Sequence, residues 1–407
     1  MARTIPIYAG KPASTATGLE FRVSPPLSLY IHVPWCVRKC PYCDFNSHEA
    51  EGTIPERAYV DALIADLQSA LPLIWGRPVQ TVFFGGGTPS LLSPAAIDEL
   101  LAAFRALAML APDAEVTLEA NPGTVEAAKF AGFRAAGVNR LSLGIQSFDD
   151  RHLAALGRIH GGAEARVAAA LAAEHFERFN LDLMYGLPGQ TQAEALADVE
   201  AALAFAPPHL SCYQLTLEPN TRFAAFPPEL PAADACADMQ DAIEARLAAA
   251  GYANYETSAF ARPGRQCRHN LNYWYFGDYL GIGAGAHSKL TRHDGVVRQM
   301  RWKRPATYLE QVAAGKPVHE EHTVAAADLP FEFLMNALRL AEGFPPSLFE
   351  SRTALPLSVI RGRLDAAVGE GLLAMDGERI APTARGRRFL NRLLAGFLDG
   401  EKGEPTA

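Results

Sequence analysis

Three cysteines lie close together near the amino terminus of this 407-residue chain, at Cys36, Cys40 and Cys43. In a reducing compartment, such a triplet is more typical of a metal site than of a disulfide framework. Iron–sulfur clusters normally take four protein thiolates, so three leave one iron without a protein ligand. An open metal position marks a catalytic site rather than a closed structural one. We expect the other three cysteines to be inert thiols: Cys212, Cys236 and Cys267.

The triplet alone leaves a second interpretation open, a zinc site or structural cluster completed by His32 or His48. The surroundings favour the open cluster. A glycine-rich segment, GGGTP at residues 85–89, follows the second predicted strand. Glycines let the backbone come close to a ligand, so carbonyl groups there can accept a hydrogen bond from an amino group. Most glycine-rich loops are only turns, and the pairing with the triplet is what makes this one informative.

Six predicted strands alternate with six predicted helices over the first 250 residues. β-Branched and aromatic runs predict strands at 28–33, 79–84, 115–119, 140–145, 180–184 and 210–215. Alanine- and leucine-rich stretches predict helices at 55–71, 94–110, 125–136, 163–176, 193–205 and 232–250. Repeated βα units give a parallel sheet covered by helices, and apolar strands such as 81–84 fit a sheet buried on both faces. The pattern leaves an open doubly wound sheet and an incomplete (βα) barrel as alternatives.

The unusual residues follow the carboxyl ends of these strands, where both architectures place their chemistry. The cysteines follow the first strand, and the glycine-rich segment follows the second. The later strands are followed in turn by NPG at 121–123, Gln146, GLPG at 186–189 and EPN at 218–220. Agreement over six consecutive units indicates one site at one end of the sheet.

Charge and hydropathy exclude some classes of protein. The formal net charge of −8 argues against a nucleic-acid-binding surface spread over the whole molecule. No apolar run approaches the roughly 18 residues that a membrane span needs. Residues 1–21 lack the apolar block and cleavage site of a signal peptide. We therefore expect a cytoplasmic protein that binds no nucleic acid.

The C-x3-C-x2-C spacing, with the aromatic Tyr42 before the third cysteine, resembles the signature of the radical S-adenosylmethionine (SAM) superfamily. The segment at 85–89 is its expected companion. The resemblance implies a [4Fe–4S] cluster whose open iron binds the amino and carboxylate groups of SAM. It also implies reductive cleavage of SAM to methionine and a 5'-deoxyadenosyl radical. In such chemistry the cofactor performs the difficult step, while the protein positions it.

Four further stretches, at 28–36, 141–148, 156–160 and 180–188, resemble the oxygen-independent coproporphyrinogen III oxidase (HemN-like) family. The similarity covers about residues 25–395. It implies an α/β fold, a partial (βα)6 TIM-type radical SAM barrel with a small, mostly helical, winged-helix-like C-terminal domain.

We expect five segments on this basis. They are an N-terminal extension at 1–23, the barrel at 24–250, an aromatic and glycine-rich extension packing on the barrel at 251–320, the helical domain at 321–397 and a disordered tail at 398–407. A hairpin at 372–380, turning at Asp376-Gly377, belongs to the helical domain.

The resemblance implies SAM contacts at matching positions. Tyr30, Gly86 and Glu119 match residues that line the cluster-bound SAM. The positions that hold a second SAM or its surroundings in the oxidases are matched by Tyr42, Gly87, Thr88, Gln146, Arg158 and Asp182. Single residues also have structural interpretations, because Glu119 and Asp182 can cap helices and Arg158 can form a surface ion pair. Their gathering at one end of one barrel favours a ligand site.

Two departures distinguish this chain from the oxidases. Phe45 stands where the oxidases carry a further cysteine two residues beyond the third. The run at 269–274, HNLNYW, matches the HNxxYW motif of the HemW branch of haem chaperones. The branch implies haem as cargo, haem-acceptor respiratory proteins, some of them membrane-associated, as partners, and an electron donor such as flavodoxin or ferredoxin.

The aromatic run supplies candidate haem contacts: His269, Tyr273, Trp274 and, after the glycine run at 281–285, His287. Imidazole is a common axial ligand of haem iron, and the aromatic rings can pack on a porphyrin face. The alternative is that the rings belong to the core and that His269 bonds a backbone carbonyl. No C-x-x-C-H sequence is present, so covalent haem attachment is not expected.

We therefore expect a haem chaperone built on a radical SAM fold, without coproporphyrinogen dehydrogenase activity. An enzyme is the alternative, either an oxygen-independent coproporphyrinogen III dehydrogenase or a related radical SAM methyltransferase. A third interpretation, an iron–sulfur scaffold with a vestigial SAM site, is disfavoured because so many SAM-contact positions are present.

Overall fold

The computed structural model describes residues 18–123 and 127–398. Most of the predicted N-terminal extension and nearly all of the predicted tail at 398–407 lie outside these residues, as does the start of the helix predicted at 125–136. Within the described residues, no helix is both long enough and apolar enough to cross a membrane.

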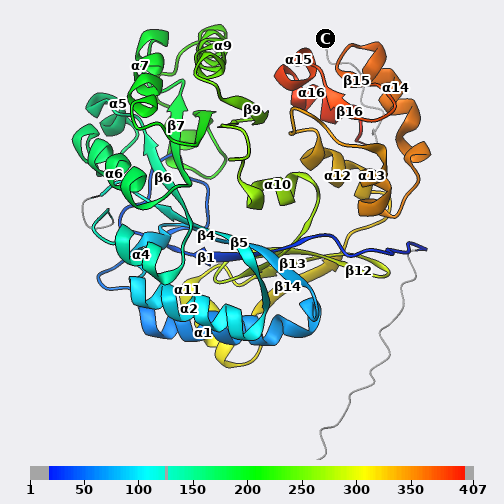
Figure 1. Ribbon diagram of the computed structural model, residues 1–407, viewed down its shortest axis with the longest axis horizontal. Coiled ribbons are helices and arrows are strands. Elements are labelled where there is room, and N and C mark those ends of the chain that lie inside the picture. Colours follow the sequence, from blue (N-terminus) through cyan, green and yellow to red (C-terminus); the bar gives the residue numbers. More distant parts are fainter. Residues whose placement is uncertain (1–17, 124–126, 399–407) are drawn as a thin grey trace, which may run out of the picture.

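A parallel sheet forms the centre of the molecule (Figure 1). Its six core strands lie in the order β1, β4, β5, β6, β7 and β8, and each neighbouring pair is parallel. Their bounds are β1 Leu27–Val33, β4 Pro78–Gly86, β5 Met109–Ala120, β6 Arg140–Gln146, β7 Phe179–Tyr185 and β8 His209–Gln214. The six predicted strands and the α/β fold class are confirmed.

Helices between these strands cover the outer face of the sheet (Figure 1). They are α1 Glu56–Ile74, α2 Pro94–Leu107, α4 Phe130–Ala136, α5 Asp150–Ala155, α6 Gly162–His175, α7 Gln192–Leu203 and α9 Ala233–Ala249. The start of α7 has the sequence signature of a helix N-terminus, a capping box. Thr191 accepts a hydrogen bond from the Glu194 backbone N–H, and the Glu194 side chain accepts one from Thr191.

One helix prediction ran too far. The helix predicted at 94–110 ends at Leu107, because Met109 and Leu110 already belong to β5. These two residues pair with Pro78 and Val79 of β4, so the sheet overrides the helical preference of the local sequence.

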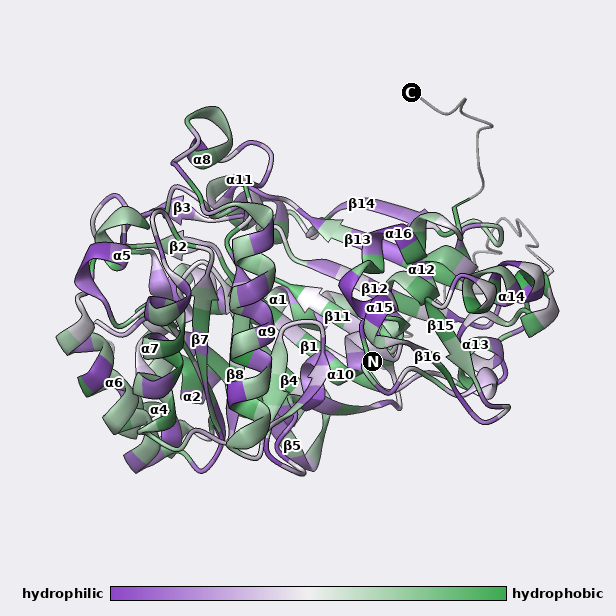
Figure 2. Cartoon of the chain, turned by 90° about the horizontal axis from the view of Figure 1, so that it is seen from above, coloured by the Kyte–Doolittle hydropathy of each residue, from purple (hydrophilic) through white to green (hydrophobic). Residues whose placement is uncertain are grey.

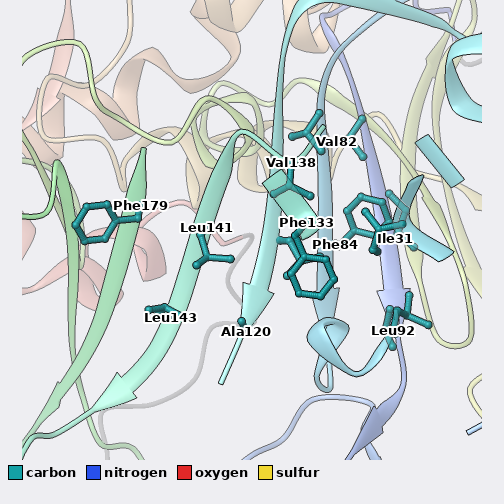
Figure 3. Close-up of a cluster of buried hydrophobic side chains, with 14 of the residues drawn as sticks. Ile31, Val82, Phe84, Leu92, Ala120, Phe133, Val138, Leu141, Leu143 and Phe179 are labelled. Atoms are coloured by element: carbon teal, nitrogen blue, oxygen red, sulfur yellow. The ribbon is translucent and has the colours of Figure 1, made fainter. Parts of the chain in front are cut away.

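Side chains alternate along the core strands between an apolar outer face and a polar inner face. Leu141 and Leu143 of β6 point outward into the main hydrophobic core, which Phe133 of α4 also joins (Figure 3). Polar residues occupy the inner positions of the strands, among them Ser28, Thr81, Glu119, Ser142, Asn180, Asp182 and Ser211. Both faces of the sheet are buried, as the apolar run at 81–84 predicted. That run did not predict that the buried inner face is polar.

Residues beyond 250 extend the sheet at both edges. β9 Ala253–Glu256 and β10 Ala259–Ala261 continue from β8, and β11 Asp278–Ile282 lies parallel to β1. Three antiparallel strands follow β11: β12 His287–Arg292, β13 Gly295–Arg301 and β14 Val318–Thr323. Helix α10, Arg268–Trp274, packs on the inner face of β1 and β4 (Figure 2), and α11, Pro305–Ala313, packs against α1. The predicted boundaries at 250 and 320 remain predictions.

A small C-terminal group of helices lies beside β12 and β13 (Figure 2). It consists of α12 Leu329–Ala337, α13 Pro346–Thr353, α14 Arg361–Gly369, α15 Ala384–Arg388 and α16 Leu390–Ala395 around the hairpin β15 Leu373–Met375 and β16 Ile380–Pro382. The predicted hairpin is confirmed, and Asp376 stabilises its turn by accepting from the backbone N–H groups of Glu378 and Arg379. The helices enclose a second hydrophobic core around Phe333 and Phe344.

A buried ion pair ties the sheet extension to α1. Asp66 of α1 and Arg301 of β13 are fully buried, with 3.1 Å between Asp66 Oδ1 and an Arg301 guanidinium nitrogen. Tyr308 of α11 donates to Asp66 Oδ2 at 2.9 Å, and the Gly283 backbone N–H donates to the same oxygen at 3.3 Å. One carboxylate therefore joins three segments that follow residue 280 to the first helix.

Replacing Asp66 with alanine should lower the free energy of unfolding by about 3–5 kcal/mol, because Arg301 is left buried without its partner. Chemical denaturation of the cluster-free protein measures this. Asp61→Ala is the matched control on the same helix. Asp61 is exposed and paired with Arg57, so its loss should cost less than about 1 kcal/mol. Equal effects of the two changes would contradict this account of the network.

Candidate functional site

The predicted site residues gather around one cavity at the carboxyl ends of the core strands. The cavity is lined by Cys36, Cys40 and Cys43 together with eight of the nine predicted SAM contacts: Tyr42, Gly86, Gly87, Thr88, Glu119, Gln146, Arg158 and Asp182. The ninth, Tyr30, lines an adjoining cavity that shares Gly86 and Glu119 with the first. The structure thus brings together residues from the ends of β1, β4, β5, β6 and β7.

The cysteines lie on a loop that leaves β1 and folds back on itself. Its two ends pair as short strands, β2 Trp35–Cys36 and β3 His48–Glu49. Lys39 holds the loop from within, since its Nζ donates to the carbonyl oxygens of Phe45 and Ser47 at 3.2 and 3.1 Å. The short helix α8, Arg222–Ala225, supports the loop from outside, and the Phe223 backbone N–H donates to the Pro41 carbonyl.

The donor set fits an iron–sulfur cluster better than a single ion. The three cysteines are free and half-buried. Across the described residues, no three His, Cys, Asp or Glu side chains converge as ligands of one metal ion do. Neither His32 nor His48 lines the cavity, and both His32 ring nitrogens have partners, the Tyr30 hydroxyl and the Asn46 carbonyl. The histidine-completed zinc site considered from the sequence is therefore disfavoured.

Burial sets the acidity of these thiols. It raises the pKa of both Cys36 and Cys43. Iron binds the thiolate form, so loading the cluster displaces the protons that burial retains on the sulfur atoms.

The glycine-rich segment packs directly on the backbone of the cysteine loop. A Cβ atom on Gly87 would lie 2.5 Å from the Trp35 carbonyl oxygen, which cannot move aside as a side chain can. Gly86 has φ of +114°, and a Cβ there would lie 2.7 Å from the His32 ring. Glycine is thus required at both positions to bring the end of β4 against the cysteines.

Two carboxyl groups project inward from the strands, and neither caps a helix. Glu119 Oε2 accepts from the Gly86 backbone N–H at 3.3 Å, while Asp182 accepts from Asn180 at 2.7 Å and from Ser142 at 3.4 Å. Burial, and then the nearby Asp182, raise the pKa of Glu119 to about 8. Burial also raises the pKa of Asp182. A cationic amino group would find ready acceptors here.

Arg158 is directed at the cluster loop rather than at the surface. Its guanidinium donates to Cys40 Sγ at 3.5 Å, to Asn121 Oδ1 at 2.7 Å and to the Gly144 carbonyl at 2.8 Å. No carboxylate of the described chain forms an ion pair with Arg158. The surface ion pair considered from the sequence is therefore wrong. The charge of Arg158 instead lies beside Cys40 and lines the open cavity.

Gln146 stands at a distortion at the end of β6. Its φ is +67°, and the pairing of β6 with β7 shifts register between Gly144 and Gln146. The Gln146 amide oxygen accepts from the Tyr213 hydroxyl at 2.6 Å. A non-glycine residue in the left-handed region costs about 1–3 kcal/mol and is characteristic of functional sites.

Several cavity residues were not singled out as ligands from the sequence. Tyr213 lies on the inner face of β8, and Asn121 donates from its side chain to the Thr88 hydroxyl at 3.0 Å. Asn121 sits in the NPG run that was noted only as unusual. Strand periodicity could have placed Tyr213 inward, but no local motif distinguishes it.

Of the four haem candidates, His269 and Trp274 line neither cavity. His269 is buried on α10, with Nδ1 2.7 Å from the Thr81 hydroxyl and Nε2 3.1 Å from the Tyr273 hydroxyl. Trp274 packs under the Arg339 guanidinium. Tyr273 and His287 both line the adjoining cavity. The haem-ligand role of His269 remains a prediction, and the backbone-carbonyl partner imagined for it is replaced by two hydroxyl groups.

Comparison with known proteins agrees with this geometry. The model of the radical SAM superfamily matches residues 30–202, and that of the HemN C-terminal domain matches residues 324–389. The chain is 52% identical to the heme chaperone HemW of Escherichia coli K12, over 92% of this chain and 98% of that protein. It is 40% identical to the heme chaperone HemW of Mycobacterium tuberculosis H37Rv, over 94% and 97%.

A solved structure supports the same fold. The chain matches the coproporphyrinogen III oxidase HemN of Escherichia coli, a radical SAM enzyme, with a TM-score of 0.78. The match covers 92% of this chain and 90% of that one, at 26% identity. The predicted HemN-like architecture is confirmed.

Replacing Cys36, Cys40 or Cys43 singly with alanine should abolish the [4Fe–4S] cluster, because only three thiols line the cavity. Iron and sulfide analysis after anaerobic reconstitution measures this. The matched control is Cys236→Ala on α9, the same chemical change at a buried thiol outside the cavity, which should leave the iron content unchanged. A cluster that survives any of the three changes would overturn the ligand assignment.

The raised pKa of Glu119 predicts a pH dependence of stability. Its folded pKa of about 8 exceeds the unfolded value, so the folded state holds a proton that the unfolded state has released. Between about pH 5 and 8, the cluster-free wild type should therefore lose up to about 1.4 kcal/mol per pH unit relative to Glu119→Gln. Denaturation of both proteins across this range tests it, and parallel pH profiles would refute it.

Proposed function

Because this chain belongs to the HemW family of the radical SAM superfamily, we propose that it binds haem and delivers it to haem-requiring respiratory proteins. The observation that carries the proposal is the close, nearly full-length similarity to HemW proteins, against 26% identity to the oxidase HemN. The family implies a [4Fe–4S] cluster and SAM as resident cofactors. Haem is the cargo.

The residues that would hold the two cofactors are the cavity residues already described. Cys36, Cys40 and Cys43 supply the cluster ligands, and Glu119 and the backbone at Gly86 lie where an amino group of SAM can bind. When bound, the reduced cluster supplies one electron to SAM. The chain itself positions the ligands, contributes the Arg158 charge beside Cys40, and supports the cysteine loop with α8.

Phe45 supports a chaperone over an oxidase. It occupies the position of the oxidases' extra cysteine, and its side chain is 58% exposed at the edge of both cavities. A phenyl group can neither donate nor accept a proton, so chemistry that used a thiol at this place is lost. The same exposed ring offers an apolar contact to a flat ligand.

The partners and the location belong to this proposal. We infer respiratory haem proteins as acceptors, flavodoxin or ferredoxin as electron donor, and the cytoplasm as the site of action. We also propose that the protein binds no nucleic acid, because its formal net charge of −8 argues against a nucleic-acid-binding surface spread over the whole molecule.

Added SAM should change the electron paramagnetic resonance spectrum of the reduced cluster, because SAM becomes a ligand of the open iron. The Glu119→Gln variant should bind SAM more weakly, since an amide cannot lose a proton to become the anionic acceptor that a cationic amino group favours. Thr117→Val on the same strand, outside the cavity lining, is the control and should respond like the wild type. Identical spectra with and without SAM would contradict the open-iron assignment.

The cluster-loaded protein should bind haem in an optical titration and should not convert coproporphyrinogen to protoporphyrinogen. Both assays are run anaerobically with SAM and reductant. Formation of protoporphyrinogen that depends on SAM and reductant would show that the protein is the enzyme and would contradict the proposed chaperone function. If the protein binds no haem, the proposed chaperone function is wrong.

A further inference from the structure

A second cavity adjoins the cluster cavity on the side of β11 and β12. Gly86, Glu119 and Phe45 line both, so the two spaces are neighbours within the barrel mouth. Beyond this shared wall, the second cavity is bounded by Tyr30 and His32 of β1, by Asn46 of the cysteine loop, and by residues that follow position 270 on α10, β11 and β12. It is thus built jointly by β1, the cysteine loop and the part of the chain that extends the sheet beyond β1. Because Tyr30, Gly86 and Glu119 also match the contacts of the cluster-bound SAM, a ligand in this cavity would lie directly beside SAM.

The walls of the second cavity suit a flat aromatic ligand. Tyr30, Tyr273 and Tyr279 line it, with Phe45 at its edge. The rings of Tyr273 and Tyr279 meet edge to face, with centroids 4.5 Å apart. Tyr279 is held in turn by Arg298, which donates to its hydroxyl at 2.8 Å. Rigid aromatic rings supply contact area to a planar ligand at little entropic cost.

Two imidazoles line this cavity, and only one is free to bind a metal. His32 is engaged at both ring nitrogens. The His287 ring has no hydrogen-bond partner among the described residues, and it lies at the exposed start of β12. Burial, and then Lys303 and Arg298, lower the pKa of His287, so its imidazole is neutral at pH 7 and keeps a lone pair for a metal.

The charges around His287 complement an acidic ligand. Lys303 and Arg298 are the cations that lower its pKa, while the carboxylate of Glu320 acts more weakly in the opposite direction. Lys303 is exposed and forms no ion pair with any carboxylate in the described chain. Arg298 is paired with Glu332 of α12 at 2.6 Å. Neither cation lines the cavity itself, but their positive potential at His287 favours a ligand that carries carboxylate groups.

Resting on the function proposed above, we propose that haem lies in this second cavity with His287 as its axial ligand, and that His269 is a positioning residue. Haem combines a planar aromatic ring and a metal that binds imidazole, which the cavity lining matches, with two carboxylates, which the cations near His287 favour. In this arrangement Tyr273 and Tyr279 contact the ring.

The role of His269 follows from its hydrogen bonds. The Thr81 hydroxyl holds Nδ1, so the ring cannot turn, and Nε2 holds the Tyr273 hydroxyl four residues along α10. The side chain is only 1% exposed, which leaves it no access to a ligand. His269 therefore acts on the haem cavity through Tyr273.

Imidazole rescue distinguishes a ligand from a positioning residue. The cluster-loaded protein is titrated anaerobically with haem, with and without added imidazole, and the Soret band is followed. His287→Ala should weaken haem binding about tenfold or more and lose the spectrum of the histidine-bound haem. Added imidazole should restore that spectrum. His269→Ala should weaken binding but keep the spectral type, with no response to imidazole. His293→Ala, at an exposed turn after β12, is the control and should match the wild type.

The outcomes separate this inference from the function on which it rests. If the wild type binds no haem, the proposed function fails. If the wild type binds haem and His287→Ala gives the same spectrum and affinity, the haem site assigned here is wrong while the function stands. Imidazole rescue of His269→Ala, with none for His287→Ala, would make His269 the ligand. Iron content of each variant confirms that the cluster is retained.

Discussion

The structure depends on two glycine-containing segments, at 85–89 and 281–285, that pack closely against β1 and the cysteine loop that follows it. On one side, Gly87 leaves no room for a Cβ against the Trp35 carbonyl oxygen. On the other, a Cβ on Gly283 would lie 2.4 Å from the His32 carbonyl oxygen, and one on Gly285 would lie 2.2 Å from the Asn46 side chain. Asn46 completes the contact by donating to the carbonyls of Ala284 and Lys303. The loop is thereby fixed between the second βα unit and the sheet extension.

This arrangement explains why the cluster cavity and the second cavity are neighbours. The cluster loop contacts the core barrel through Gly87 and contacts the extension through Asn46. Each cavity lies at one of these contacts, and Phe45 lies at the edge of both. Ligands in the two cavities would share Gly86 and Glu119, so binding of one is expected to alter the affinity for the other by the same factor in both directions.

The sequence predicted the parts of the molecule that are encoded locally. Alternating strands and helices, the cysteine spacing and the glycine segment each lie within a short stretch, and the family resemblance assembled them into one barrel. The sequence did not show that residues 278–323 add four strands to the same sheet, because β11 pairs with β1 some 250 positions earlier in the chain. Nor did it show the partners of His269, since Thr81 comes from a distant strand. An HNxxYW motif read alone suggests a metal ligand, whereas the folded chain gives that imidazole two hydroxyl groups.

The central claim is that one chain holds an iron–sulfur cluster and a haem in adjoining cavities. An anaerobic crystal structure of the reconstituted protein with SAM and haem, phased on iron anomalous scattering, tests it most directly. The account predicts iron of a four-iron cluster beside Cys36, Cys40 and Cys43, with SAM on the open iron, and a separate single iron beside His287. A second SAM filling the cavity between Tyr273 and His287, with haem absent or elsewhere on the protein, would contradict it.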